Sequence, residues 1–192
     1  MDNPIHEETQ NDHVIKIFHD PDPESPREWG NLGTITCWHR RYRLGDKHDF
    51  EDPQECLKSL AGCADATDLD RNALFERATR QAIILPLYLY DHSHITMNTT
   101  GFHCPWDSGQ VGYTYATLED VRKEYSVQRV SAQLRARVAK LLVQEVARFD
   151  DFITGNCYGY VVSKDEEQVD ACWGYFGDYE GHCLAEARAC VS

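Results

Sequence analysis

Residues 131–176 read SAQLRARVAKLLVQEVARFDDFITGNCYGYVVSKDEEQVDACWGYF, and this stretch decides the fold class. Apolar residues recur at every third or fourth position of its first half, which predicts an amphipathic helix beginning at Ser131. They are Leu134, Val138, Leu141, Leu142, Val146, Phe149, Phe152 and Ile153. Gly155 follows where helices commonly end. Two strands, 157–163 and 169–176, then form a hairpin through the acidic turn 164–168.

Capping residues indicate other helices on either side of this stretch. Asp52 followed by Pro53 starts a helix that should run to about residue 60. Asp68 or Asp70 caps a second helix, and Thr117 with Asp120 forms a capping box for a third. A last short helix is expected over 184–191.

Four further strands are expected at 13–18, 33–39, 83–90 and 111–116. Strands and helices do not alternate strictly, so the sequence predicts an α+β fold with a largely antiparallel sheet and helices packed on one face. The length suits a single domain over residues 14–192, preceded by a flexible acidic tail at 1–13.

The charge of the chain is strongly negative and unevenly placed. The chain has 32 Asp+Glu against 19 Lys+Arg, a formal net charge of −13. The segments 1–39 and 149–192 carry this excess, whereas the middle of the chain is balanced. Such a charge repels nucleic acid and anionic lipid, so we expect basic proteins as partners and neither direct nucleic-acid nor membrane binding. If the ends of the chain come together, their charge concentrates on one surface.

The eight cysteines are scattered and contain no C-x-x-C pair, which disfavours a zinc finger. The N-terminal residues do not resemble a secretory signal, and no apolar run reaches membrane-spanning length. We therefore expect a cytoplasmic protein with reduced thiols and no cofactor.

An unusually polar segment, YDHSHITMNTTGFHCPWDSGQVG, occupies residues 90–112. If His92 and His94 lie on one strand, their spacing of two places both imidazoles on one face. Zinc could then bind there, with His103, Cys104 or Asp107 completing the site.

The same segment also permits thiol chemistry, in which Cys104 is the nucleophile, His92 or His103 the base and Asp107 the residue that orients the base. The alternative is a rigid connection between strands, in which Pro105 fixes a turn, Trp106 fills the core and Gly109 takes a positive φ. The sequence alone leaves these three interpretations open.

Several strings resemble a family of proteins encoded by bacteriophages and other mobile elements. They are REWGNLGTITCWHRRYRLGDKHDF, LPLYLYDHSHITM, CPWDSGQVGY, YGYVV and ACWGYFGD, and they cover about residues 14–180. The resemblance implies no particular activity, substrate or catalytic residue. It does imply a phage setting, in which small acidic proteins are often inhibitors of host defence enzymes.

Carboxylates can imitate backbone phosphates and occupy a basic groove, so the leading hypothesis is a non-enzymatic inhibitor of a defence nuclease, of the anti-CRISPR or anti-restriction type. The candidate contact residues are Asp20, Asp22, Glu24, Glu28, Asp165, Glu166, Glu167, Asp170, Asp178 and Glu180. A solvated surface that only keeps the protein soluble explains the same residues. The other hypotheses are a metal- or cysteine-dependent enzyme in the 90–112 segment and a host-takeover or virion-associated binding protein.

Overall fold

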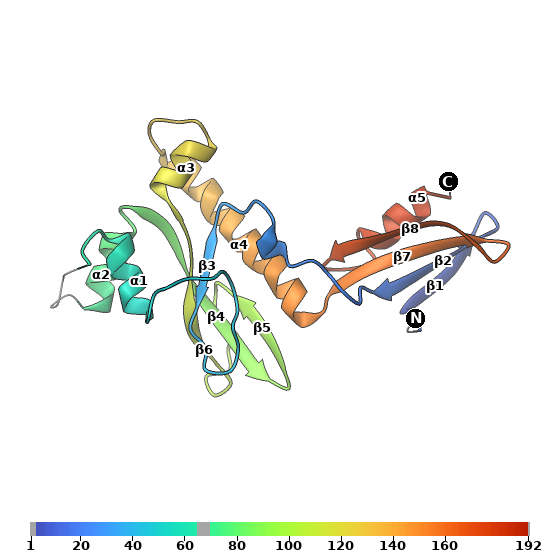
Figure 1. The fold of residues 1–192 in the computed structure, drawn as a ribbon, viewed down its shortest axis with the longest axis horizontal. Coiled ribbons are helices and arrows are strands. Elements are labelled where there is room, and N and C mark those ends of the chain that lie inside the picture. The colour runs from blue at the N-terminus through green and yellow to red at the C-terminus, as the bar shows by residue number, and fades with distance from the viewer. Residues whose placement is uncertain (1–2, 65–69, 192) are drawn as a thin grey trace. The chain divides into compact units, whose positions relative to one another are not determined.

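The computed structural model describes residues 3–64 and 70–191, which form five α-helices and two four-stranded antiparallel sheets. This confirms the α+β class and the antiparallel pairing, although the strands divide between two sheets. Contacts group the chain into two compact units, Met1–Pro26 with Asp150–Ser192 and Arg27–Phe149 (Figure 1). The single domain expected over 14–192 therefore stays a prediction.

The two units differ sharply in charge. The first contains 16 Asp+Glu and 3 Lys+Arg, so it carries the whole net charge of −13. The second contains 16 of each and is neutral. We call them the acidic unit and the neutral unit.

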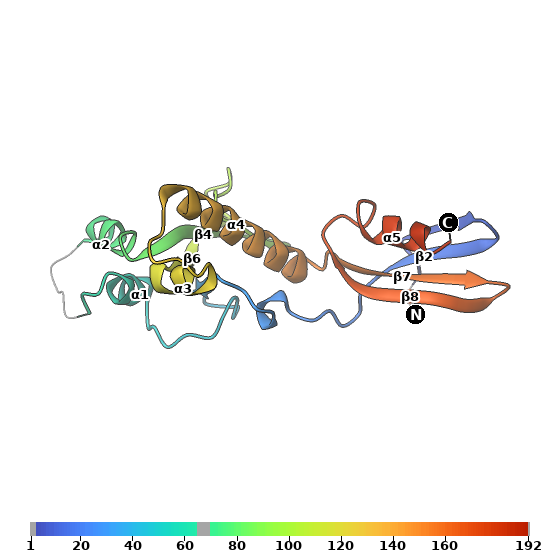
Figure 2. The same cartoon turned by 90° about the horizontal axis from the view of Figure 1, so that it is seen from above.

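The acidic unit is built on a sheet whose strand order is β1-β2-β7-β8. Its strands are β1 (His6–Gln10), β2 (His13–His19), β7 (Cys157–Lys164) and β8 (Glu167–Phe176). The chain ends meet where β2 pairs with β7, as in the register Ile15↔Val162. Helix α5 (Cys183–Ala189) covers one face of this sheet (Figure 2). Residues 1–13, expected to be a tail, contain β1, because its alternating residues pair along β2.

Both hairpins of this sheet close through two-residue turns. Asn11 and Asp12 form one turn and Asp165 and Glu166 the other, all with φ between 49° and 68°. Such left-handed residues match the twist of paired strands. Because Val14 pairs with Ser163, both turns lie at the same end of the sheet. We call this end the tip. The acidic turn predicted over 164–168 is thus shorter than expected.

The neutral unit contains a sheet of order β3-β6-β4-β5. Its strands are β3 (Thr34–Cys37), β4 (Ala82–His92), β5 (His94–Asn98) and β6 (Ser108–Thr117). Its helices are α1 (Pro53–Leu60), α2 (Arg71–Ala78), α3 (Leu118–Glu124) and α4 (Ala132–Thr154). A 3-10 turn at Pro26–Glu28 precedes β3. Helix α4 continues past residue 149 into the chain of the acidic unit. None of the helices in the described ranges is both long and apolar enough to cross a bilayer.

Helices pack on both faces of this second sheet, where one face was expected. Ala82 and Ile84 belong to a core cluster with residues of α1 and α2. Ile83 lies between them in sequence and belongs to a different cluster, with residues of α3 and α4. Successive strand residues point to opposite faces, so an uninterrupted apolar run in β4 serves two cores.

The predicted helix starts are confirmed by capping hydrogen bonds. Asp52 accepts from the Glu55 N–H at 2.8 Å, and Asp70 accepts from the N–H of residue 73 at 2.8 Å. Thr117 accepts from the Asp120 N–H at 3.1 Å. Asp68, the other expected cap of α2, lies outside the described residues. These side chains satisfy N–H groups that have no partner within the helix.

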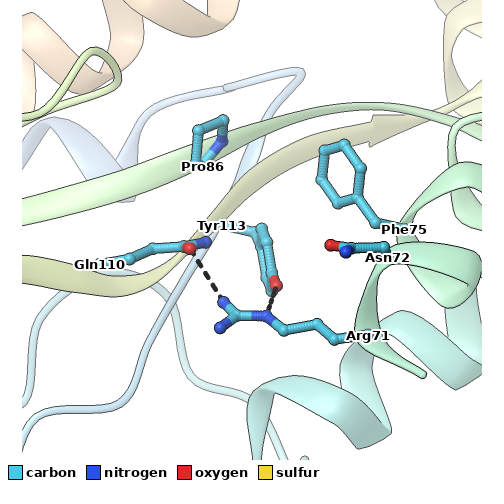
Figure 3. A pocket seen from close by; sticks show the side chains of 6 residues that line it. All are labelled: Arg71, Asn72, Phe75, Pro86, Gln110 and Tyr113. Atoms are coloured by element: carbon cyan, nitrogen blue, oxygen red, sulfur yellow. Dashed lines mark hydrogen bonds between the residues drawn. The ribbon is translucent and has the colours of Figure 1, made fainter.

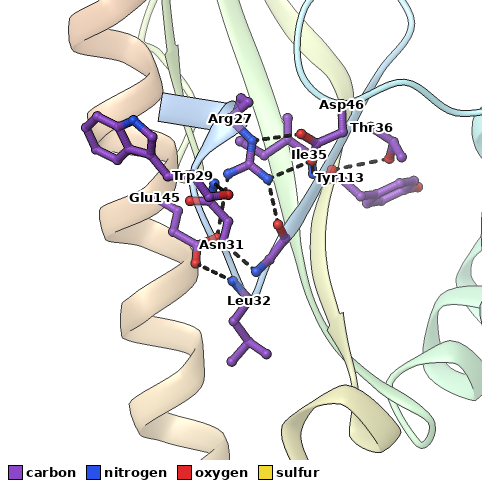
Figure 4. A network of polar contacts seen from close by, with 10 residues as sticks. Arg27, Trp29, Asn31, Leu32, Ile35, Thr36, Asp46, Tyr113 and Glu145 are labelled. Carbon is purple, nitrogen blue, oxygen red and sulfur yellow. Dashed lines mark hydrogen bonds and ion pairs between the residues drawn. The ribbon is translucent and has the colours of Figure 1, made fainter. Parts of the chain in front are cut away.

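A buried ion-pair network fixes the segment that leads into β3 (Figure 4). The Arg27 side chain is 8% exposed and donates to both Asp46 carboxylate oxygens, at 2.9 and 2.6 Å. Its Nη1 lies 3.7 Å from Glu145 of α4. Glu145 also accepts from the N–H groups of residues 32–33 at 3.0 Å. Burial raises the pKa of Glu145, while these N–H donors and Arg27 oppose that shift.

Candidate functional site

The structure places nine of the ten candidate acidic residues in the acidic unit; Glu28 belongs to the neutral unit. Their side chains do not share one environment. Eight are exposed, whereas Asp20 and Asp170 are half-buried.

Asp165, Glu166 and Glu167 lie at the tip and are all exposed. We call these three the tip acids. Asp12 occupies the neighbouring turn and is exposed too, although sequence reasoning did not select it. Its signal was the Asn-Asp pair between two alternating segments, which is typical of a hairpin turn. The tip therefore presents four carboxylates, three on two adjacent turns and one on the first residue of β8.

The remaining exposed candidates of the acidic unit, Asp22, Glu24, Asp178 and Glu180, follow the other ends of β2 and β8. Strand β7 has 8 residues. At roughly 3.3 Å per residue, the two ends of the sheet are about 25 Å apart. The candidate acids therefore lie in two groups, at opposite ends of the sheet, because strand register places them there.

Two of the candidates have structural partners. Asp20 accepts from the N–H groups of Gly174 and Asp22, both at 3.1 Å. Asp170 accepts from the Tyr160 hydroxyl at 3.1 Å. Hydrogen bonds from Cys190 and Tyr160 lower the pKa of Asp170. These two carboxylates are used within the unit itself.

The 90–112 segment forms the ends of β4 and β6, the whole of β5 and the loop 99–107. Strand β5 was not predicted. His92 and His94 lie on different strands, directly opposite each other across Ser93, which has a φ of 57°. The assumption that both lie on one strand is wrong, because the chain reverses between them.

Asp107 contacts two of the three other residues proposed for thiol chemistry, Cys104 and His92. The Cys104 thiol donates to Asp107 Oδ2 at 3.4 Å, and His92 Nδ1 lies 3.5 Å from the same oxygen. The hydrogen-bond partner of the sulfur is thus a carboxylate, which repels a thiolate, whereas nucleophilic cysteines pair with a base or a cation. His103 lines a separate hollow with Tyr88.

Zinc was the other chemistry proposed for this segment. Within the part of the chain that the structure describes, no three His, Cys, Asp or Glu side chains form a group that could hold a metal ion. His92, His94, His103 and Cys104 therefore do not converge.

Trp106 is 92% exposed, so the expectation that it fills the core is wrong. It lines a hollow of about 470 Å³ with Arg40, Arg41 and Asp91. The Arg41 guanidinium pairs with the Asp91 carboxylate. Gly101 in the same loop takes a positive φ of 87°, and Gly109 does not, contrary to expectation. The tryptophan of this loop therefore lies in solvent and does not fill the core.

No family model, curated protein or solved structure matches the chain. The resemblance to phage-encoded proteins therefore stays a prediction, and the candidate residues are assigned from geometry alone.

Proposed function

We propose that this chain is a non-enzymatic binding protein that uses its acidic unit to occupy a basic, nucleic-acid-binding surface of a host defence complex, such as a CRISPR effector or restriction nuclease. The observation that carries the proposal is the charge division, −13 in one compact unit and zero in the other. A field of this size steers association with positive surfaces and repels nucleic acid.

Within the acidic unit, the tip is the part best suited to contact a partner. The tip acids are exposed and lie on a tight hairpin, so they are presented at low cost in conformational entropy. The opposing charge nearby is Lys164, whose backbone pairs with that of Glu167. The tip therefore carries a net negative charge that can imitate phosphates. The proposed place of action is the cytoplasm of the host cell, where such defence complexes act.

The test compares two variants with equal loss of charge. One replaces the tip acids by Asp165→Asn, Glu166→Asn and Glu167→Gln, since Asn tolerates the positive φ of this turn. The matched control carries Glu51→Gln, Glu76→Gln and Glu124→Gln, which remove three exposed acids from the neutral unit.

The measurement has two steps. The full chain first captures nucleic-acid-binding proteins from infected host cells, and its affinity for each purified candidate is then determined at 50 and 200 mM salt. We expect at least about tenfold weaker binding for the tip variant, unchanged binding for the control, and displacement by duplex DNA. Equal affinity of the two variants, or binding that duplex DNA does not affect, contradicts the proposal.

A second candidate function is thiol-dependent catalysis, which is favoured by the 3.5 Å approach of His92 Nδ1 to Asp107, the residue expected to orient the base. The contact of the Cys104 thiol with the same carboxylate does not favour it. Cys104→Ser should then abolish the ability of the chain to support phage growth, whereas Cys63→Ser should not. Full activity of Cys104→Ser ends this alternative. For its metal-dependent form, elemental analysis of the purified chain should find stoichiometric zinc.

A further inference from the structure

A small hollow in the neutral unit lies between helix α2 and strands β4 and β6 (Figure 3). Its volume is about 260 Å³. It is lined by Arg71, Asn72, Phe75, Pro86, Gln110 and Tyr113. The lining combines one cation with amide groups and apolar rings, and it contains no acidic side chain. This composition is typical of a site for a small organic anion.

The guanidinium of Arg71 is held in place by two neutral acceptors. Its Nε donates to the Tyr113 hydroxyl at 3.1 Å, and its Nη2 donates to Gln110 Oε1 at 2.9 Å (Figure 3). The same guanidinium lies 5.9 Å from the centre of the Tyr113 ring. These contacts orient the group without cancelling its charge.

Arg71 differs in this respect from two other arginines of the neutral unit. Arg27 and Arg41 both bind carboxylates. Among residues 3–64 and 70–191, no carboxylate lies within ion-pair distance of Arg71. A guanidinium has five N–H groups, so three remain to bind a carboxylate or a phosphate.

The rest of the hollow defines the remainder of the ligand. Phe75 packs against Tyr113 with ring centres 6.1 Å apart, and Pro86 lies on the strand beside them (Figure 3). These residues suit a flat apolar group. The volume is below the range of drug-sized ligand sites, so the ligand is small.

We propose that this hollow binds a small organic anion, with its carboxylate or phosphate on Arg71 and a flat apolar body against Phe75 and Pro86. The site belongs to the neutral unit and does not depend on the charge of the acidic unit. It is therefore independent of the function proposed above.

The test is an NMR titration of the full chain with three probes of similar shape, benzoate, phenyl phosphate and neutral benzamide. We expect saturable shifts at the amides of Arg71, Phe75 and Gln110 for one or both anions, and at least about tenfold weaker binding of benzamide. The preferred anion identifies the headgroup. If neither anion saturates, or if benzamide binds equally well, the proposal is overturned.

Variants connect the binding to Arg71. Arg71→Gln should weaken anion binding at least about tenfold, whereas Arg77→Gln on the exposed side of the same helix should leave it within about twofold. Tyr113→Phe keeps the buried ring but removes one orienting acceptor, so a smaller, severalfold loss is expected. Unchanged binding in Arg71→Gln contradicts the proposal.

Discussion

The acidic and neutral units are both antiparallel sheets covered by helices, yet they use charged residues in opposite ways. The neutral unit pairs its charges inside the structure, as Arg27 does with Asp46 and Glu145. The acidic unit has few cations to pair, and most of its carboxylates face solvent. A net charge far from zero destabilises a compact state through self-repulsion. The exposed charge of the acidic unit therefore opposes its own folding, whereas the neutral unit balances its charges within itself.

The largest expected effect tests the internal pairing of the neutral unit. Arg27→Met leaves the half-buried Asp46 and the nearly buried Glu145 without their cation and should lower the free energy of unfolding by about 3 kcal/mol, the lower end for breaking a buried pair. Urea denaturation measures this loss. Arg77→Met removes an exposed arginine from the same unit and should change stability by less than about 0.5 kcal/mol. A loss below about 1 kcal/mol for Arg27→Met would show that the network is unimportant.

A smaller effect tests packing in the acidic unit. A Cβ atom at Gly159 would lie 2.1 Å from the Trp173 ring, so Gly159→Ala should cost about 1–3 kcal/mol. A Cβ at Gly109 of the neutral unit meets no atom within 4 Å, so Gly109→Ala is the control. Combining Gly159→Ala with Trp173→Ala should cost at least about 0.5 kcal/mol less than the sum of the single changes. Additive losses would exclude the clash.

The next effect concerns the principal ion pair of the acidic unit. Arg188 of α5 donates to both carboxylate oxygens of Glu8 on β1 at 2.7 Å, and this lowers the pKa of Glu8 to about 2 from its usual 4.5. The pair therefore stabilises the fold above pH 4.5, and this contribution is lost as the pH falls toward 2.

Glu8→Gln should accordingly destabilise the acidic unit by about 1 kcal/mol at pH 7, because the pair is partly exposed and screened. The difference from the unchanged chain should shrink as the pH approaches 2 in thermal unfolding experiments. Glu7→Gln, on the same strand, serves as the control. A difference that is constant between pH 7 and pH 2.5 contradicts the assignment.

The smallest expected effect compares the units directly. Raising salt from 0.05 to about 0.5 M screens repulsion between exposed carboxylates and should stabilise the acidic unit by about 0.5 kcal/mol. Hydrogen exchange can report this at the amides of Ile15 and Val162, with Ile84 and Tyr115 reporting on the neutral unit. Equal responses would indicate that the charge division has no energetic consequence.

The features that sequence predicted correctly depend on local chemistry. The caps at Asp52 and Thr117 bond to N–H groups three residues away, so neighbouring residues determine them. The helix beginning after Ser131 and the hairpin that follows were likewise visible in their periodicity. Strand β5 was missed because His94–Asn98 is short and polar, and its partner in β4 supplies the pairing.

The features that sequence could not predict depend on distant residues. The division of the strands into two sheets depends on which strands pair. For example, Ile15 of β2 pairs with Val162 of β7, far away in the sequence. The sequence indicated that the two charged ends of the chain could come together. It did not indicate that strand register would place their carboxylates at two opposite ends of one sheet. The exposure of Trp106 likewise depends on how far the 99–107 loop projects, which its composition does not encode.

The β2–β7 pairing has a consequence for synthesis on the ribosome. Strand β2 is made first, but its partner appears only after all residues of the neutral unit have been translated. The neutral unit can thus acquire its structure during translation, while the first hairpin waits with one edge uncovered. A premature stop after residue 149 would leave that hairpin permanently without the β7 strand that it pairs with.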